Sequence, residues 1–283
     1  MNIYVCGWFH PKNKLFLEYY VKQNNNVSNI DEADIVIAGS DFYDIHKYPT
    51  KKFILGPHYS VFPTNKLNKL NNTHKNTIYI QPSLLCMNIW KDEFKFNKLP
   101  LKYIPFGVDT NKFKPLNTKQ FIFIYVKDRN PDQVKFVCEM LEKKYKLKYV
   151  IIDYKKGYDE NYYLYILQRA KFGIWIGTAE SQGFALQEAL SCNVPLLVWN
   201  VKQMSEQWSH RKQYENIKSE VTSIPYWNKT CGEYFYEQKY FNKVFDKFIL
   251  NLKSYQPRNF ILNHLSMEKC TILWNNLIKN EFI

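Results

Sequence analysis

The sequence predicts an α/β protein with two domains, each built on a parallel β-sheet. The chain has 283 residues, which suits one large domain or two modest ones. Hydrophobic residues make up 46% of it and charged residues 23%, so it can bury a sizeable core and is not a disordered chain. Short apolar runs alternate with helical patterns, as in sheets whose parallel strands are joined by crossover helices.

Short apolar runs organise the first half of the chain, and two of them end at a glycine. We expect strands over residues 2–6, 34–39, 52–56 and 77–80. A loop containing Gly7 and Trp8 follows the first of these strands, and a helical pattern around Phe16 comes next. This order of elements is that of a parallel sheet with crossover connections.

The second half shows a cleaner alternation of the same elements. We expect strands over residues 121–126, 148–153, 172–176 and 195–199. Helices are expected between them over residues 131–145, 159–170 and 184–192. The polar stretch from Asn111 to Lys119 is a candidate interdomain linker. After Pro257, an amphipathic segment predicts terminal helices.

These elements divide the chain into three parts. We expect a Rossmann-like first domain over residues 1–115, a Rossmann-like second domain over residues 116–256, and C-terminal helices over residues 257–283. The terminal helices could pack back across the domains. The two domains are expected to face each other across a cleft, because open α/β sheets bind ligands outside the carboxyl ends of their strands.

The chain is strongly basic, with 39 Lys and Arg against 26 Asp and Glu, a formal net charge of +13. Such a balance is compatible with nucleic-acid binding. However, the lysines are spread along the chain and accompany other residues of AT-rich codons, so no specific nucleic-acid partner is expected. The charge instead favours an anionic ligand or peripheral contact with an anionic membrane surface.

The sequence also excludes several other classes of protein. No apolar run reaches the length of a membrane-spanning helix, and the first residues do not resemble a signal peptide, which predicts a cytoplasmic protein, soluble or peripheral on a membrane. The six cysteines form no C-x-x-C pair and the six histidines no H-x-x-x-H pattern. Neither a disulfide framework nor a metal site is therefore expected.

The segment from Phe172 to Pro195 carries the most chemical information. A strand runs into a short loop, and Gly183 then opens a helix. The backbone N–H groups of Gly183 and Phe184 would form an anion site at that helix start. Glu188 lies about one and a half turns further on, where a carboxylate could accept hydrogen bonds from paired ribose hydroxyls.

Glu180 and Glu188, with seven residues between them, resemble the E-x7-E motif of retaining GT-B glycosyltransferases. The surrounding string, E-S-x-G-F-x-L-x-E-A-L-x-x-x-x-P, resembles more closely the large family 4 of these enzymes, including viral and bacterial members. The alternative is that Glu180 merely caps the helix and Glu188 is solvated on its surface. The segment from Phe106 to Pro115 resembles the closure of the first domain in that family.

The resemblance implies further roles in the second, donor-binding domain. Lys127 and Arg129 would bind the donor diphosphate, on the assumption that alternate residues after a strand point the same way. The alternative is two ordinary surface cations. Gly157 and Tyr158 would form the platform for the nucleotide base, although a tyrosine that only packs is nearly as good an explanation.

The resemblance implies weaker assignments in the first, acceptor-binding domain. Gly7 and Trp8 occupy the first strand–helix turn, where such enzymes approach the donor or the acceptor. His58 follows a strand at a position where the family often has a histidine near the transferring sugar. His58 and Glu180 are therefore the candidate catalytic residues.

The function implied by the resemblance is transfer of a sugar from a nucleotide diphosphate donor, such as a UDP- or GDP-sugar, to an acceptor hydroxyl. The acceptor would be a glycan, a glycolipid or a protein-linked sugar. We expect a retaining reaction without metal or cofactor, since cationic side chains would stabilise the leaving diphosphate. The alternatives are a GT-B epimerase or phosphorylase, an inactive sugar-nucleotide-binding module and, less favoured, a nucleic-acid-binding protein.

Overall fold

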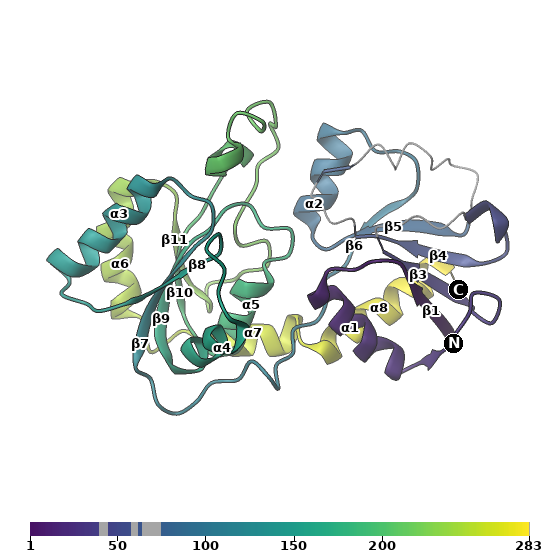
Figure 1. Ribbon diagram of the computed structural model, residues 1–283, viewed down its shortest axis with the longest axis horizontal. Coiled ribbons are helices and arrows are strands. Elements are labelled where there is room, and N and C mark those ends of the chain that lie inside the picture. The colour runs from purple at the N-terminus through teal and green to yellow at the C-terminus, as the bar shows by residue number, and fades with distance from the viewer. Residues whose placement is uncertain (40–44, 58–61, 64–74, 283) are drawn as a thin grey trace. The chain divides into compact units, whose positions relative to one another are not determined.

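The computed structural model describes residues 1–39, 45–57, 62–63 and 75–282 (Figure 1). The chain forms two compact units. Unit 1 comprises Met1–Gly107 together with Leu265–Ile283, and unit 2 comprises Val108–His264. Both are α/β units with a parallel sheet, as the sequence predicts.

Unit 1 has a six-stranded sheet in the order β2-β1-β3-β4-β5-β6, with every neighbouring pair parallel. Its strands are β1 Asn2–Cys6, β2 Asn25–Asn26, β3 Ile35–Ala38, β4 Lys52–Leu55, β5 Thr77–Gln81 and β6 Leu101–Tyr103. Its α-helices are α1 Pro11–Lys22, α2 Leu84–Asn88 and α8 Met267–Phe282. The sequence predicts β1, β3, β4 and β5, and does not predict the short edge strands β2 and β6.

Helix α1 begins at a local signal in the sequence. Pro11 occupies the first turn, where its missing N–H costs nothing, and the His10 side chain accepts a hydrogen bond from the Lys12 N–H at 3.3 Å. The apolar face of α1 is buried, with Phe16 and Tyr20 fully enclosed. These positions follow the helical spacing that the sequence shows.

Unit 2 has a five-stranded parallel sheet in the order β11-β10-β9-β7-β8. Its strands are β7 Phe121–Val126, β8 Val150–Asp153, β9 Ala170–Ile176, β10 Leu196–Trp199 and β11 Gly232–Phe235. Its α-helices are α3 Pro131–Glu139, α4 Glu160–Arg169, α5 Phe184–Ser191, α6 Phe241–Leu250 and α7 Pro257–His264. Helix α3 continues into a π-helical turn over Met140–Lys144.

Helices α3 and α6 cover one face of this sheet, and α4 and α5 lie on the other (Figure 1). Val137 of α3 and Phe245 of α6 join the inward side chains of β7 and β9 in one buried cluster. The sequence analysis does not predict α6 or β11. The signal for α6 is present in the spacing of Phe241, Phe245 and Phe248, which are all buried.

The division of the chain differs from the sequence-based boundaries in two places. In the structure, the first stretch of unit 1 ends at Gly107, whereas the first domain predicted from the sequence extends to residue 115. The terminal helices also do not form one group, since α7 belongs to unit 2 and α8 to unit 1. Among the described residues, no helix is both long and apolar enough to cross a membrane.

Candidate functional site

The carboxyl ends of β7 and β9 meet at the point where the strand order of unit 2 reverses. The chain runs from β7 to β8 on one side of it and then to β9 on the other. Val126 is paired with Ile176 at the ends of these strands, and the Lys127 N–H donates to the Ile176 carbonyl at 3.0 Å. Ligands of open α/β sheets bind at such reversals. This edge is therefore where a ligand is expected.

Lys127 and Glu180 form an ion pair at this edge. The Lys127 Nζ donates to Oε1 of Glu180 at 2.8 Å and to Oε2 at 2.9 Å. The ammonium also lies 4.9 Å from the centre of the Tyr154 ring, a cation–π contact. Glu180 is further fixed by its backbone N–H, which donates to the Thr222 carbonyl at 3.1 Å. Two residues with separately predicted roles therefore share one cluster.

Both members of this pair are largely buried, with side chains 24% and 11% exposed for Lys127 and Glu180. Burial opposes the charged ammonium, but the neighbouring groups, Glu180 foremost with Tyr154 and Asp128, together outweigh burial and raise the pKa of Lys127 above its usual value. Lys127 therefore carries its charge at neutral pH. A lysine that keeps its charge in a partly enclosed site can bind an anion.

Helix α5 begins beside this ion pair. Gly183 is its N-cap residue, with a left-handed backbone (φ +80°, ψ +47°), and a glycine has no side chain that could cap the helix. A Cβ at Gly183 would lie 3.6 Å from the Cβ of Glu180, an ordinary contact, so the backbone angle rather than space favours glycine there. An amino end without a side-chain cap directs backbone N–H groups outward, as the predicted anion site requires.

Glu188 lies inside α5 and is only 4% exposed. Burial raises the pKa of the Tyr163 hydroxyl, and other charges, that of Glu188 among them, raise it further. The alternative of a glutamate solvated on the helix surface is therefore wrong. The other half of that alternative also fails, because the N-cap of α5 is Gly183 and not Glu180. The ribose-binding role of Glu188 stays a prediction.

Arg129 is buried and has different partners from Lys127. Its Nη1 donates to the carbonyls of Gly177 at 2.9 Å and Trp199 at 3.0 Å. Its Nε donates to Gln133, whereas Nη2 has no hydrogen-bond partner among the described residues and lies 3.7 Å from Glu206. Burial lowers the pKa of Arg129 to about 10, which still leaves it charged at neutral pH. Nη2 is itself buried, so Arg129 is enclosed by protein groups on all its nitrogens that the structure describes.

Asp128 explains why the two cations differ. Its φ is +48°, so the extended backbone that would direct Lys127 and Arg129 the same way ends between them. That geometric assumption of the sequence analysis is therefore wrong. The interpretation as two ordinary surface cations is also wrong for Arg129, which is 4% exposed. The predicted contacts of both residues with a diphosphate are left as predictions.

The buried Asp128 also forms a hydrogen-bond network that is not predicted from the sequence. Its carboxylate accepts hydrogen bonds from Lys155 Nζ at 2.6 Å, from the Ser209 N–H at 3.1 Å and from the Ser209 hydroxyl. Its carbonyl accepts from the Trp208 N–H at 2.9 Å. Burial opposes the ionised carboxylate, but these partners outweigh it and lower the pKa of Asp128. The network ties the segment after β10 to the end of β7.

Gly157 and Tyr158 follow β8 on the same edge of the sheet. Gly157 has φ +74°, and a Cβ there would meet nothing within 4 Å. The Tyr158 ring lies 4.9 Å from Tyr163 and 6.2 Å from Tyr125, centre to centre. The packing role that the sequence left open is therefore observed. Stacking of Tyr158 on a nucleotide base stays a prediction.

The predicted residues of the first half lie in unit 1 or outside the described residues. Gly7 has φ +77° at the carboxyl end of β1, and Trp8 is 46% exposed. Both line a surface pocket of about 770 Å³ between β1 and the start of α1. His58 falls outside the described residues. In the part of the chain that the structure describes, no group of three or more His, Cys, Asp or Glu side chains could hold a metal ion.

Neither a protein-family model nor a curated protein matches the sequence. Solved structures match over nearly the whole chain. The glycosyltransferase from Rickettsia africae ESF-5 has 14% identity and a TM-score of 0.59, covering 98% of this chain and 83% of that one. The lipopolysaccharide outer core galactosyltransferase WaaB has 11% identity and a TM-score of 0.55, with both chains covered fully.

A third structure was solved with ligands. A point mutant of S. aureus TarM, in complex with fondaparinux, α-GlcNAc-glycerol and UDP, has 13% identity and a TM-score of 0.55 over 94% of this chain. This chain covers less than two thirds of some of these proteins, 58% of that TarM chain and 61% of the chain matched in the GtfA/B complex. These likenesses decide the architecture. The fold is GT-B.

In this GT-B protein, long-range contacts assemble the site from segments that the sequence identifies separately. The structure brings Lys127, Glu180 and Gly183 together at the reversal of the strand order. Asp128 and Glu206 are not among the site residues predicted from the sequence. For Asp128 a signal existed, because aspartate directly after a strand is one of the few residue types that adopt positive φ readily.

Proposed function

We propose that this protein is a retaining, metal-independent glycosyltransferase that moves a sugar from a nucleotide diphosphate sugar to an acceptor hydroxyl. The observation that carries the proposal is the Lys127–Glu180 ion pair beside the amino end of α5, at the reversal of the strand order. A cation, a helix amino end and a carboxylate are the groups needed for a diphosphate attached to a sugar.

Lys127 and Glu180 can bind the two parts of the donor without separating. An ammonium has three donors, and two of those of Lys127 point at Glu180. The third is left for a phosphate oxygen. Each carboxylate oxygen can accept a further hydrogen bond, so Glu180 can bind hydroxyls of the transferring sugar while it holds Lys127. The ion pair would thereby fix the sugar relative to its leaving group.

The amino end of α5 would stabilise the leaving group. Negative charge builds up on the diphosphate as the anomeric C–O bond breaks, and the helix start places backbone N–H groups and the positive end of the helix dipole beside that charge. The ammonium of Lys127 and the positive charge of the buried Arg129 would add to this stabilisation. These fixed cationic groups are the proposed substitute for a metal ion.

The remaining roles follow the resemblance to family 4 enzymes. Glu188 would bind the ribose, and Gly157 with Tyr158 the base of a UDP- or GDP-sugar. Gly7 and Trp8 line a pocket in unit 1 that would receive part of the acceptor, a glycan or glycolipid. The UDP and glycan-like compounds in the TarM structure support a nucleotide sugar and a carbohydrate acceptor here. The net charge of +13 suits an anionic donor and a cytoplasmic protein in peripheral contact with anionic membrane surfaces.

A panel of UDP-, GDP- and TDP-sugars, screened by thermal unfolding with and without excess EDTA, tests the proposal. A ligand that binds only the folded state raises the unfolding temperature, so at least one donor should do so, and its turnover should survive EDTA. Activity that is lost with EDTA and returns with manganese would contradict metal independence. Absence of stabilisation by every sugar nucleotide would contradict the function itself.

Lys127→Ala locates the donor within the structure. The variant should weaken nucleoside diphosphate binding by about 1.5–3 kcal/mol, the value of a hydrogen bond to a charged group, and leave nucleoside binding unchanged. Lys171→Ala is the matched control, since Lys171 is exposed at the opposite end of β9. Equal losses for nucleoside and diphosphate would place Lys127 outside the phosphate site.

A further inference from the structure

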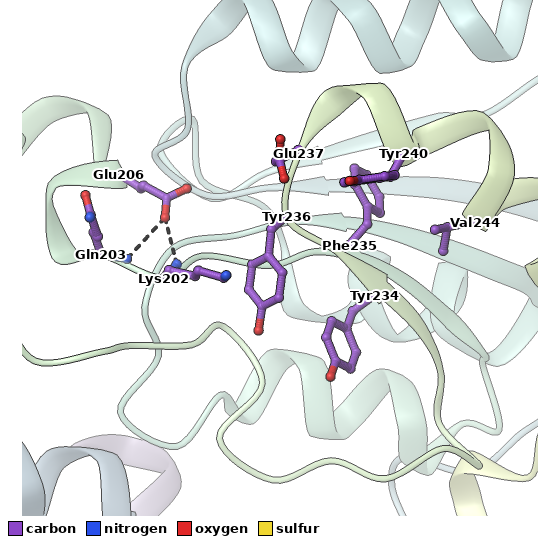
Figure 2. A pocket seen from close by; sticks show the side chains of 9 residues that line it. All are labelled: Lys202, Gln203, Glu206, Tyr234, Phe235, Tyr236, Glu237, Tyr240 and Val244. Atoms are coloured by element: carbon purple, nitrogen blue, oxygen red, sulfur yellow. Dashed lines mark hydrogen bonds between the residues drawn. The ribbon is translucent and has the colours of Figure 1, made fainter.

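A pocket of about 440 Å³ lies at the carboxyl ends of β10 and β11, apart from every residue given a role above (Figure 2). Its volume falls within the range of small-molecule sites, about 300–1,000 Å³. Its lining includes Lys202, Glu206, Tyr234, Tyr236, Glu237 and Tyr240. They come from the segment after β10, from β11 with its following turn, and from the turn before α6.

Tyrosine rings form the walls of this pocket. Tyr234 and Tyr240 are 46% and 45% exposed, so much of each ring is accessible to a ligand. Tyr236 packs edge-on against Tyr234 with ring centres 5.7 Å apart, and the Lys202 ammonium lies 4.6 Å from its ring centre. Figure 2 shows the rings of Tyr234 and Tyr236 projecting to the same side, with the Lys202 side chain beside Tyr236. Tyrosine faces offer flat apolar contact with a polar tip.

Glu206 is held in a fixed orientation at the edge of the pocket. Its Oε1 accepts hydrogen bonds from the backbone N–H groups of Lys202 at 2.7 Å and Gln203 at 3.1 Å. Its Oε2 lies 3.7 Å from the buried Nη2 of Arg129. The side chain is still 32% exposed. A rigid carboxylate that remains accessible is suited to accept hydrogen bonds from ligand hydroxyls.

The charges in the pocket restrict the ligand further. Glu206 and Glu237 are negative, and the Glu237 charge is offset by Lys239 at 2.6 Å. Glu206 is likewise offset by Arg129. Neither carboxylate therefore attracts a cation strongly, and the Lys202 ammonium disfavours one further. A neutral ligand with an apolar face for the tyrosines and several hydroxyls for the polar groups fits these conditions. A pyranose ring has both features.

We infer that this pocket is a saccharide subsite, and that it binds a sugar unit of an oligosaccharide acceptor. All strands of the unit 2 sheet are parallel, so the pocket and the Lys127–Glu180 pair lie on the same edge of that sheet. Arg129 connects the two, since it approaches Glu206 and donates to the Gly177 carbonyl. The inference rests on the proposed function and specifies its substrate class as oligosaccharides rather than free monosaccharides.

Saturation-transfer NMR without any donor tests the subsite. The probes are three neutral tetrasaccharides, namely maltotetraose, cellotetraose and chitotetraose, and UDP as an anionic competitor. At least one tetrasaccharide should bind the full chain, and UDP should not displace it. The Tyr234→Ala and Tyr240→Ala variants should each weaken that binding by up to about tenfold, the effect of losing one aromatic contact.

Tyr103→Ala is the matched control, because Tyr103 is also 46% exposed and also lies in an edge strand, but in unit 1. It should bind the tetrasaccharide as the unmodified protein does. Donor hydrolysis should be unchanged in all three variants. The subsite would be overturned if no tetrasaccharide bound or if UDP displaced the bound one. It would also be overturned if the Tyr234→Ala and Tyr240→Ala variants bound the tetrasaccharide as tightly as the unmodified protein does. Failure of sugar nucleotides to bind would instead overturn the proposed function, and the two results are measured separately.

Discussion

At the residue scale, Glu180 and Glu188 have different surroundings although both are largely buried. Glu180 directs both carboxylate oxygens at the Lys127 ammonium. Glu188 lies within α5, where its charge helps to raise the pKa of the Tyr163 hydroxyl after the larger effect of burial. The first carboxylate is coupled to the proposed phosphate contact and the second is not. Neutralising each should therefore have a different consequence.

We predict that Glu180→Gln keeps or increases affinity for nucleoside diphosphates, because Lys127 loses its anionic partner, while sugar transfer is lost. Glu188→Gln should instead weaken binding of every nucleotide by roughly 1.5–3 kcal/mol, the value of a lost hydrogen bond to a charged group. Loss of a transition-state contact lowers kcat, whereas loss of uniform binding raises KM. Calorimetric titration with UDP and GDP, together with initial rates, distinguishes these outcomes.

Circular dichroism is the control for both glutamate variants, since a misfolded protein would also be inactive. If both variants bound UDP and GDP with the affinity of the unmodified protein, the ribose role of Glu188 would be wrong. If Glu180→Gln kept full turnover, Glu180 would have no role at the transferring sugar.

The charge of Asp128 contributes to the stability of the folded protein. Its pKa is lowered because Lys155 and Ser209 outweigh burial, so the folded state favours the ionised form. A carboxylate with a lowered pKa contributes stability fully above its unfolded pKa, near 4, and loses that contribution as the pH falls through the lowered value.

We predict that Asp128→Asn lowers the free energy of unfolding by about 1–2 kcal/mol at pH 7, since asparagine keeps one oxygen acceptor and loses the charge. The difference from the unmodified protein should be constant between about pH 5 and 7 and shrink below about pH 4. Urea unfolding across this range measures it. Lys155→Ala should lower the free energy of unfolding less in the Asp128→Asn variant than in the unmodified protein, because the side chains of Lys155 and Asp128 interact. A pH-independent difference would contradict the ionic contribution.

At the scale of elements, the long segment between β10 and β11 is fastened to the sheet at several points. Asn200, directly after β10, is 2% exposed, and its Oδ1 accepts from the Ser223 N–H at 2.8 Å and from the Thr222 hydroxyl at 2.9 Å. The Thr222 carbonyl in turn accepts from the Glu180 N–H. This segment therefore supports the loop that carries Glu180. Its far end depends on β11, which pairs with β10.

Strand β11 approaches β10 closely because of Gly232. This residue is paired with Leu196 and has φ +137°, and a Cβ there would lie 2.0 Å from the Leu196 carbonyl oxygen. Such a contact between backbone and side chain cannot be relieved by a rotamer change. The position needs glycine for both its backbone angle and its space.

We predict that Gly232→Ala lowers the free energy of unfolding by about 3 kcal/mol or more, combining a positive-φ penalty with overpacking. Gly157→Ala is the control, since Gly157 also has positive φ but open space around its Cβ, and should cost about 1–2 kcal/mol. Chemical denaturation of both variants gives the comparison. Equal costs would show that β11 does not approach β10 as closely as described.

At the scale of the whole molecule, the chain returns to its first unit at the end. Helix α8, near the carboxyl terminus, packs on α1: the Tyr20 hydroxyl donates to Asn275 at 2.8 Å. Trp274 is fully buried between Phe16 and Phe106, and its Nε1 donates to the Pro105 carbonyl at 3.0 Å. Gly107 has no room for a side chain, because a Cβ would lie 2.7 Å from the Cα of Met267. Unit 1 is therefore complete only with residues from both ends of the chain.

We predict that Trp274→Ala lowers the stability of unit 1 by about 3–5 kcal/mol, the usual cost of removing a large buried aromatic side chain. Leu273→Ala changes the adjacent residue, which is 41% exposed, and should stay within about 0.5 kcal/mol of the unmodified protein. Hydrogen exchange resolves the effect by region, and protection should fall in β1, β3 and α1. An unchanged exchange pattern there would mean that α8 does not complete the core of unit 1.

The sequence by itself determined the local elements and the fold class. Apolar runs such as Phe121–Val126 become strands with those bounds, and Gly183 opens a helix after a strand and a loop, because both depend on neighbouring residues. The two parallel sheets follow from the order of such elements. The GT-B architecture was implied by the resemblance of the segment around Glu180 and Glu188, and not by the order of elements. Some local elements were missed, namely β11 and also α6, whose buried phenylalanines follow the helical spacing.

Only the tertiary structure decided which side chains meet. Lys127 and Glu180 are 53 positions apart, and nothing local pairs them; the parallel register of β7 and β9 does. The positive φ of Asp128 separated the partners of Lys127 and Arg129, which strand periodicity alone would have aligned. The terminal helices divided between the two units because Trp274 finds its buried partners near the start of the chain. Such contacts depend on how distant segments pack, and no window of sequence contains both partners.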